Sequence, residues 1–311
     1  MEIVGVGRYI RAMPLGLIFT PFLMKKISLS IIPTYWCKTN CKYCYLGDLR
    51  KDQTTLDLQC LDNKLHQLVE NDYVIDSISV YGGEISLLDE QYLIQIVKII
   101  RSHVSNQVTI GFCTSGYNRS IFELAEYLKV RVTIPLNQER PDYKKNLQLI
   151  KQHNCSLGVV VLPSIINTPV DQLVEFYDSL GRDVFFYQFY PSSINRSPYS
   201  FDIKQYTDFV ISFINEYKKK PRSFGLINLL EWMDKCYNPE ASGFIYISPN
   251  GKWMTTGYSD CLESFVEFDT LDQWKQYCKK ERLQRLIKCN ACPYYDKCKA
   301  EHLVVMGEEY C

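Results

Sequence analysis

The sequence predicts an α/β fold with a parallel sheet, and three observations lead to this prediction. Strand-like and helix-like segments alternate regularly up to about residue 220. Unusual short motifs come directly after the first three strand-like segments. The pattern then changes near residue 222, where a cysteine-rich region begins. We therefore expect one large α/β unit and a small second unit.

The strand-like runs are rich in β-branched and aromatic residues, and six of them occur in order along the chain: 26–35, 74–81, 106–113, 130–136, 155–163 and 182–190. Amphipathic segments with helical periodicity lie between and after them, at 56–70, 90–104, 120–129, 142–153, 169–180 and 203–219. Six strand–helix units of this kind predict parallel strands joined by right-handed crossovers. They favour a barrel or an open barrel over a flat sheet.

The pattern changes after "KKKPRS" (218–223). The segment "GFIYISPNGKWMTTGY" (243–258) predicts a hairpin that turns at its "PNG" tripeptide. The chain after this hairpin is dense in cysteine. We divide the chain into three parts: an N-terminal extension at 1–26, a core at 27–222 and a C-terminal domain at 223–311.

Composition restricts the classes of partner. The 311 residues are 46% hydrophobic and 23% charged, which is typical of a chain that folds around a large core. Lys plus Arg and Asp plus Glu both number 35, so no net charge attracts the chain to nucleic acid or to an anionic membrane. We therefore expect small or neutral partners, with no nucleic-acid and no membrane partner.

The apolar stretch "MPLGLIFTPFLMKK" (13–26) is broken by two prolines and has no small-residue cleavage site. We interpret it as a packing segment and not as a signal peptide. No run of about 18 apolar residues predicts a membrane-spanning helix. The expected location is therefore cytoplasmic, where cysteines serve more often as thiols or metal ligands than as disulfides.

The stretch "YWCKTNCKYCYLGD" (35–48) places Cys37, Cys41 and Cys44 in a C-x3-C-x2-C spacing. Independent placement of 13 cysteines in this chain would produce that spacing about 0.02 times. Structural zinc normally takes four protein ligands, whereas three thiolates leave one coordination position open. Thiolates suit iron–sulfur clusters, and a cubane held by three of them keeps one iron free. Zinc and unliganded core cysteines are the alternatives.

Two further motifs come after the next two strands, "GGE" (82–84) and "TSG" (114–116). The carboxyl ends of parallel strands lie at one edge of a sheet, so we expect these motifs to lie close to the cysteine loop. Glycines lack a Cβ and let the backbone approach a ligand closely, while Glu84 can oppose a positive charge. A simple tight turn is the alternative for "GGE".

The cysteine loop, with Tyr43 just before its last cysteine, resembles the signature of the radical S-adenosylmethionine (radical SAM) enzymes. The resemblance implies a partial (β/α)6 barrel and a [4Fe–4S] cluster on the three loop cysteines, whose open iron chelates the methionine part of S-adenosylmethionine. "YGGEISLL" (81–88) is similar to the family's Gly-Gly-Glu segment, so Gly82, Gly83 and Glu84 would meet the methionine ammonium. One electron from the cluster would then cleave the cofactor, giving methionine and a 5′-deoxyadenosyl radical that abstracts a hydrogen atom from an unactivated C–H bond.

Two weaker matches lie after the third strand and within the fourth. "TSGYN" (114–118) resembles the family's Thr-Asn-Gly segment, with Ser115 in place of asparagine. Thr133 stands where relatives often carry a serine that contacts the ribose of the cofactor. An ordinary turn and an ordinary β-branched strand residue are the alternatives.

The sequence departs from the family at the end of the fourth strand. Pro135 and Leu136 stand where many relatives have Asp-Gly. Polar contacts to the cofactor at this strand end would then fall to Asn137 or Arg140.

The C-terminal cysteines resemble the auxiliary-cluster domain known as SPASM, or its reduced form, Twitch. "SPNGKWM" and "LDQWKQYC" are similar to the hairpin and helix that precede the cysteines in that domain. Members with two auxiliary clusters carry cysteines where this chain has Thr256 and His302. The resemblance implies one auxiliary [4Fe–4S] cluster, an electron relay or structural element, with a zinc site as the alternative. Its ligands would be Cys289, Cys292, Cys298 and Cys311.

Cys261 lies near the hairpin, between Asp260 and Glu263. Three roles remain open for it: a ligand of a further cluster together with His302, a thiol that donates a hydrogen atom to a substrate radical, or a buried hydrophobic residue. We keep it as the candidate catalytic residue.

The resemblance implies an oxidoreductase that draws electrons from a donor of flavodoxin or ferredoxin type. The basic run "KKERLQRLIK" (279–288) is interpreted as a solvated face, with a docking patch for an acidic donor as the alternative. Relatives with such a C-terminal domain mostly modify ribosomally made peptides, by cross-link, thioether or epimerisation, and this peptide maturase activity is the favoured function.

Two other functions remain open. Oxidation or epimerisation of a small molecule, such as an aminocyclitol or sugar, is favoured by the short chain and by the single auxiliary cluster. The 26 residues before the first strand are too few for an added leader-peptide-binding domain, which argues against a peptide substrate. A non-catalytic metal-binding interaction protein is the third class.

Overall fold

The computed structural model describes residues 25–189, 203–226, 244–256 and 265–278. In these ranges nine strands form one sheet in the order β6-β5-β4-β3-β2-β1-β7-β8-β9. The first six are parallel to their neighbours: β1 (Lys25–Ile31), β2 (Tyr73–Val80), β3 (Thr109–Cys113), β4 (Arg131–Pro135), β5 (Ser156–Val161) and β6 (Val184–Gln188). The predicted α/β fold with a mostly parallel sheet is confirmed.

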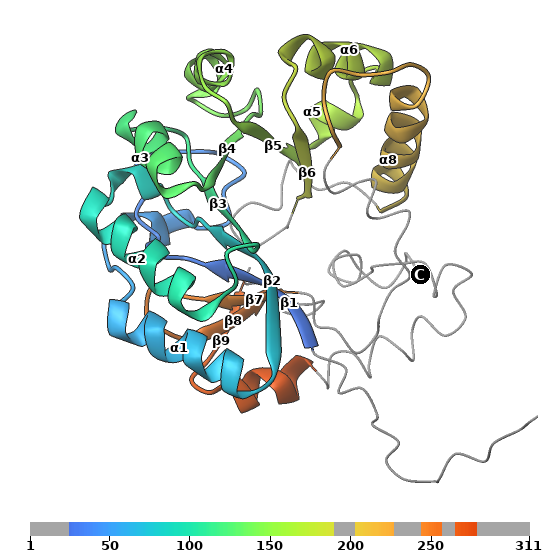
Figure 1. Ribbon diagram of the computed structural model, residues 1–311. Helices are drawn as coiled ribbons and strands as arrows, with labels where there is room; N and C mark the ends of the chain where they lie inside the picture. The colour runs from blue at the N-terminus through green and yellow to red at the C-terminus, as the bar shows by residue number, and fades with distance from the viewer. Residues whose placement is uncertain (1–24, 190–202, 227–243, 257–264, 279–311) are drawn as a thin grey trace, which may run out of the picture.

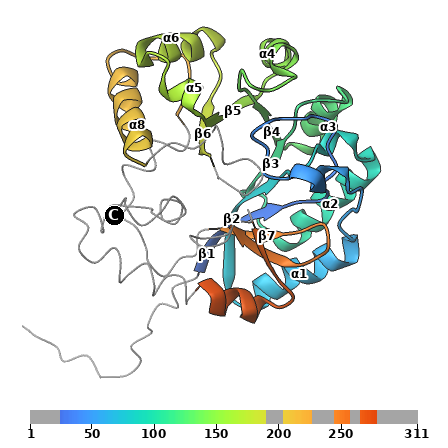
Figure 2. The same ribbon diagram turned by 180° about the vertical axis from the view of Figure 1, so that it is seen from behind.

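The helices lie along the outer side of the curved sheet, as Figures 1 and 2 show from two sides. The longer ones are α1 (Leu58–Glu70), α2 (Glu90–His103), α3 (Ser120–Leu128), α4 (Tyr143–Gln152), α6 (Val170–Leu180) and α8 (Ile203–Tyr217). Three shorter helical turns lie in connecting segments: η1 (Gly47–Lys51), η2 (Ile85–Leu87) and α5 (Pro163–Ile166). The predicted helices agree with the longer ones, whereas the short turns were not predicted.

Local sequence signals explain where these helices begin and end. Asp57 precedes α1, and its carboxylate accepts a hydrogen bond from Cys60 N at 2.8 Å. Asp89 caps α2 in the same way, accepting from Gln91 N at 2.8 Å. Gly181 ends α6 in the left-handed conformation, with φ of 59°.

Alternate residues of each strand enter the core, because successive side chains of a strand point to opposite faces. On β3 and β4 the residues facing the helices are at most 6% exposed: Ile110, Phe112, Val132 and Ile134. The residues between them, such as Cys113 and Thr133, lie on the concave face and are half-buried. The two faces therefore differ in polarity, with the apolar one toward the helices.

The hairpin predicted at 243–258 is confirmed, and it continues the same sheet. β7 (Phe244–Ile247) pairs in parallel with β1, while β8 (Trp253–Thr256) and β9 (Phe265–Phe268) add antiparallel strands. Residues 271–278 are helical. The domain boundary near residue 222 stays a prediction.

The cysteines proposed for the C-terminal domain lie outside the described residues. Within the described ranges, no helix is long and apolar enough to cross a membrane.

Candidate active site

The three-cysteine loop begins where β1 ends and is closed at its base by backbone hydrogen bonds. Leu56 N donates to Pro33 O at 2.8 Å, and Cys37 N donates to Arg50 O at 2.9 Å. Within the loop, Cys44 N donates to Cys41 O at 3.1 Å, which forms a tight turn. The three cysteines are free thiols and half-buried.

The glycine pair after β2 runs directly against the stem of this loop. Gly83 N donates to Thr34 O at 2.8 Å. A Cβ on Gly83 would lie 2.1 Å from Trp36 O, and one on Gly82, whose φ is 140°, would lie 2.7 Å from Thr34 O. The chain's own backbone therefore requires both glycines, apart from any ligand. Their predicted role toward a cofactor stays a prediction.

Glu84 is 2% exposed and joins the ends of β2 and β3. Its Oε1 accepts hydrogen bonds from Ser86 N at 3.0 Å, from Ser86 Oγ at 2.7 Å and from Thr114 Oγ1. Its Oε2 accepts from Ser115 N at 2.7 Å. Four donors thus surround a buried carboxylate, as a charge that is removed from water requires.

A second group of buried polar side chains connects β3, β4 and the cysteine loop. Arg140 donates to both carboxylate oxygens of Asp142, at 2.9 and 3.0 Å, and to Ser115 Oγ at 2.6 Å. Thr39, between the first two loop cysteines, donates from Oγ1 to Asp142 Oδ2 at 3.4 Å. Together with Glu84, this network joins the loops that come after β1, β2, β3 and β4.

Sequence reasoning named Arg140 as an alternative contact but missed Asp142 and Thr39. The available signal for Asp142 was the group of opposite charges in "ERPD" (139–142), which comes shortly after the fourth strand.

Tyr43 lies beside Asn137, and both residues are buried. Tyr43 is 7% exposed, and its hydroxyl donates to Asn137 Oδ1 at 3.4 Å. Asn137 also pairs with the backbone of β5, donating to Val160 O at 2.7 Å and accepting from Val160 N at 3.0 Å. These bonds connect Asn137 to Tyr43 and to β5. The predicted contacts of Tyr43 and Asn137 with a cofactor stay predictions. Thr133 lies in register with Cys113 on β3 and with Ser156 on β5.

The electrostatics of the loop favour neutral thiols when no metal is bound. Burial raises the pKa of Cys41 to about 12, and the Arg140 charge opposes this effect. Burial also raises the pKa values of Cys37 and Cys44. A thiol that binds a metal ion is deprotonated, so metal binding here would release protons.

The three loop cysteines are free thiols, and thiolates are soft ligands that suit iron–sulfur clusters. In a cubane held by three thiolates, each thiolate binds a different iron. The donor chemistry of the loop therefore fits a [4Fe–4S] cluster. Across the described parts of the chain, no group of three or more His, Cys, Asp or Glu side chains is arranged to hold one metal ion.

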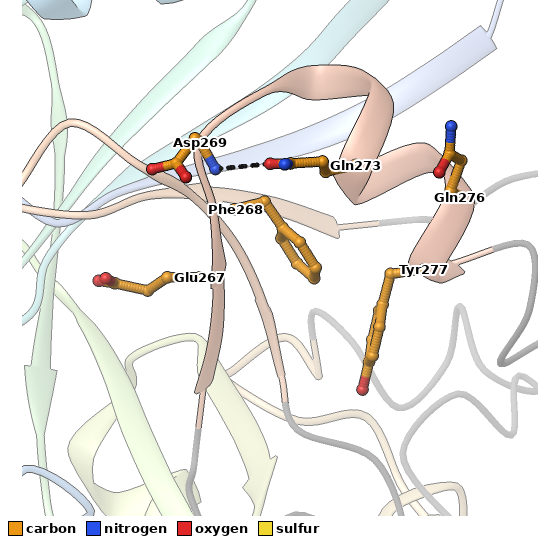
Figure 3. Close-up of a pocket in the computed structure, with 6 residues that line it drawn as sticks. All are labelled: Glu267, Phe268, Asp269, Gln273, Gln276 and Tyr277. Carbon is orange, nitrogen blue, oxygen red and sulfur yellow. Dashed lines mark hydrogen bonds between the residues drawn. The ribbon is translucent and has the colours of Figure 1, made fainter.

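Several predicted site residues lie outside the described ranges, and they are Cys261, Cys289, Cys292, Cys298 and Cys311. Figure 3 shows a separate open hollow beside β9. Phe268, Asp269 and Tyr277 are among its lining residues, and Asp269 N donates to Gln273 Oε1 at 3.0 Å. No residue predicted for the site lines this hollow.

Comparisons with known proteins identify a family for the part of the chain that contains this site. Residues 31–156 match the profile of the family described as the Radical SAM superfamily. The chain therefore contains a Radical SAM superfamily domain, which includes the three-cysteine loop and the "GGE" segment. No sequence among the curated proteins matches the chain.

Solved structures of similar fold include proteins bound to S-adenosylmethionine. "Native anSMEcpe with bound AdoMet" has a TM-score of 0.64 at 14% identity, covering 88% of this chain and 88% of that chain. Streptococcus suis SuiB bound to S-adenosylmethionine has a TM-score of 0.61 at 16% identity, covering 89% and 73%. SuiB bound to its precursor peptide SuiA has a TM-score of 0.55 at 16% identity, covering 93% and 72%. At these identities the likeness shows a shared fold.

Proposed function

We propose that this chain, with its Radical SAM superfamily domain at 31–156, is an enzyme that cleaves S-adenosylmethionine and abstracts a hydrogen atom from a substrate. Cys37, Cys41 and Cys44 would hold a [4Fe–4S] cluster. One observation carries the proposal: a loop with three half-buried free thiols is joined by hydrogen bonds to the Glu84 segment at the carboxyl edge of a parallel sheet. When bound, the cluster supplies the electron that cleaves the cofactor.

The chain's own residues would bind and orient the cofactor. Glu84 provides a fixed negative charge for the methionine ammonium through Oε2, which accepts one hydrogen bond from the described residues, whereas Oε1 accepts three. Ser115 lies just after β3 and Thr133 lies within the neighbouring strand β4, and we assign their hydroxyl groups contacts to the rest of the cofactor. Asn137 contributes by holding Tyr43 against the loop.

For the region after residue 222 we propose a SPASM- or Twitch-like domain with one auxiliary [4Fe–4S] cluster. The confirmed hairpin and the helical residues 271–278 precede the cysteines in the expected order. The proposed ligands are Cys289, Cys292, Cys298 and Cys311. With the first cluster this makes about eight irons per chain.

We propose a peptide as the substrate. Two solved structures of similar fold contain a peptide, SuiB with its precursor peptide SuiA and anSMEcpe with the Cp18Cys peptide. A donor of flavodoxin or ferredoxin type would supply the electrons in the cytoplasm, and Cys261 would return a hydrogen atom to the substrate radical.

The test is anaerobic reconstitution followed by reduction with dithionite in the presence of S-adenosylmethionine. The expected result is about eight irons per chain and formation of 5′-deoxyadenosine. A variant with alanine at Cys37, Cys41 and Cys44 should lose about half of the iron and all of the 5′-deoxyadenosine. Cys60→Ala is the matched control, since Cys60 is also half-buried but lies on α1. Wild-type protein that holds iron but makes no 5′-deoxyadenosine would contradict the proposal.

A further inference from the structure

The Arg140–Asp142 pair has features that cofactor binding alone does not explain. The side chains are 10% and 15% exposed, and both guanidinium–carboxylate bonds are formed. Burying an ion pair costs desolvation energy, which only well-placed hydrogen bonds offset. Those bonds reach Ser115 on one side and Thr39 of the cysteine loop on the other. The pair is therefore built into the support of the loop.

Hydrogen bonds connect the charges of this pair to the loop cysteines. Asp142 Oδ2 accepts a hydrogen bond from Thr39 Oγ1, and Thr39 O in turn accepts one from Cys37 Sγ at 3.7 Å. Arg140 lies on the same carboxylate. The guanidinium therefore favours negative charge at the loop, while the carboxylate beside it disfavours negative charge there.

We propose that Arg140 and Asp142 are positioning residues whose opposite charges set the reduction potential of the group held by the three-cysteine loop. This inference rests on the proposed function, in which that group is a [4Fe–4S] cluster. One-electron reduction adds one negative charge to the cluster. A nearby cation therefore stabilises the reduced form, and a nearby anion stabilises the oxidised form. The Thr39–Asp142 hydrogen bond fixes the distance between the pair and the loop.

The proposal predicts shifts of opposite sign for two variants of similar shape. Arg140→Gln removes the cation and should make the midpoint potential more negative. Asp142→Asn leaves the guanidinium without its counter-charge and should make the potential more positive. A purely structural role would move both variants in the same direction or leave both potentials unchanged.

The experiment is a redox titration of the reconstituted full-length protein, followed by electron paramagnetic resonance without S-adenosylmethionine. The signal to follow is the one that the triple alanine variant lacks. Arg222→Gln is the matched control, because this arginine is also buried and paired with carboxylates but lies beside α6. Its potential should equal that of the wild type.

Shifts of the same sign, or no shift in variants with wild-type iron content, would overturn the inference. If Arg140→Gln and Asp142→Asn lose iron, the charge-preserving variants Arg140→Lys and Asp142→Glu decide. They should hold iron and keep the potential near that of the wild type. Loss of iron in these variants too would show that the exact shape of the two side chains, and not their charge, supports the loop. That result would overturn the inference. Absence of iron in the wild-type protein would instead reject the proposed function.

Discussion

Arg140 and Arg222 both have nearly buried side chains and both pair with carboxylates, yet their surroundings differ. Arg140 pairs with Asp142, which is 15% exposed, among the loops after β1 to β4. Arg222 pairs with Glu175 and Asp178, which are 56% and 21% exposed, at the outer surface of α6. Ion pairs with exposed partners contribute little to stability, whereas buried pairs depend on all their neighbours. The Arg140 pair thus belongs to a buried network at the carboxyl edge of the sheet, whereas the Arg222 pairs are a surface contact with α6.

The largest expected loss of stability comes from adding a single methyl group to the buried network at the carboxyl edge of the sheet. Gly83→Ala would place a Cβ 2.1 Å from Trp36 O, so the "GGE" segment and the cysteine loop would have to separate. We expect a loss of about 3 kcal/mol in the free energy of unfolding, measured in urea, and loss of iron on reconstitution. Gly111→Ala is the control, because the nearest atom to its Cβ would lie 3.9 Å away. Equal stability of the two variants would refute this account of the glycine pair.

A smaller loss is expected when the buried carboxylate becomes an amide. Glu84→Gln replaces one acceptor oxygen by an NH2 group that must face hydrogen-bond donors. We expect a loss of about 1–3 kcal/mol in the free energy of unfolding and weaker binding of S-adenosylmethionine. Glu267→Gln is the surface control, since its exposed carboxylate accepts a hydrogen bond from Tyr35 and should change stability by less than about 0.5 kcal/mol. A Glu84→Gln variant as stable as this control would argue against the buried network.

Burial at the carboxyl edge of the sheet should also slow the alkylation of Cys41 in the metal-free protein. Burial raises the pKa of Cys41 to about 12, so its thiolate is scarce near neutral pH. We expect alkylation of Cys41 by iodoacetamide at about pH 8 to be at least about tenfold slower in the folded protein than in urea. Mass spectrometry of the peptide that contains Cys41 gives both rates. Equal rates would mean that the loop is open to solvent.

The smallest effect is expected at the surface contact, and it depends on pH. Hydrogen bonds from Ser223 and Arg222 lower the pKa of Asp178 in the folded protein. The ionised carboxylate therefore stabilises the fold above its unfolded pKa of about 3.9, and this stabilisation is lost as the pH falls through the lower folded value. Asp178→Asn should flatten the fall in the urea midpoint between about pH 5 and pH 3. An unchanged pH profile would show that the contact contributes nothing.

Much of the fold could be predicted because its signals are local. The alternation around Ile110 and Phe112 marks a strand, and the carboxylates of Asp57 and Asp89 mark helix starts. The proximity of the cysteine loop to Glu84 could be predicted from topology, since parallel strands end at one edge.

The rest depends on contacts between distant segments. The bond between Thr39 and Asp142 joins residues 103 positions apart and needs both loop conformations. The contact of Gly83 with Trp36 and the parallel pairing of β7 with β1 are likewise set by tertiary packing, which periodicity does not encode.

The parallel pairing of β7 with β1 makes β1 an interior strand. An isolated core that lacks β7 would therefore have β1 at the edge of its sheet. A chain cut at residue 222 would lose β7 and leave β1, the strand that leads into the cysteine loop, with unpaired backbone N–H and C=O groups along one side. Such an open edge is a template for strand addition by a second molecule. Tyr35 would also lose the hydrogen bonds that its hydroxyl donates to Met254 Sδ and Glu267 Oε1. Excision of the core should therefore produce aggregates, because β7 closes the edge that would otherwise recruit neighbours.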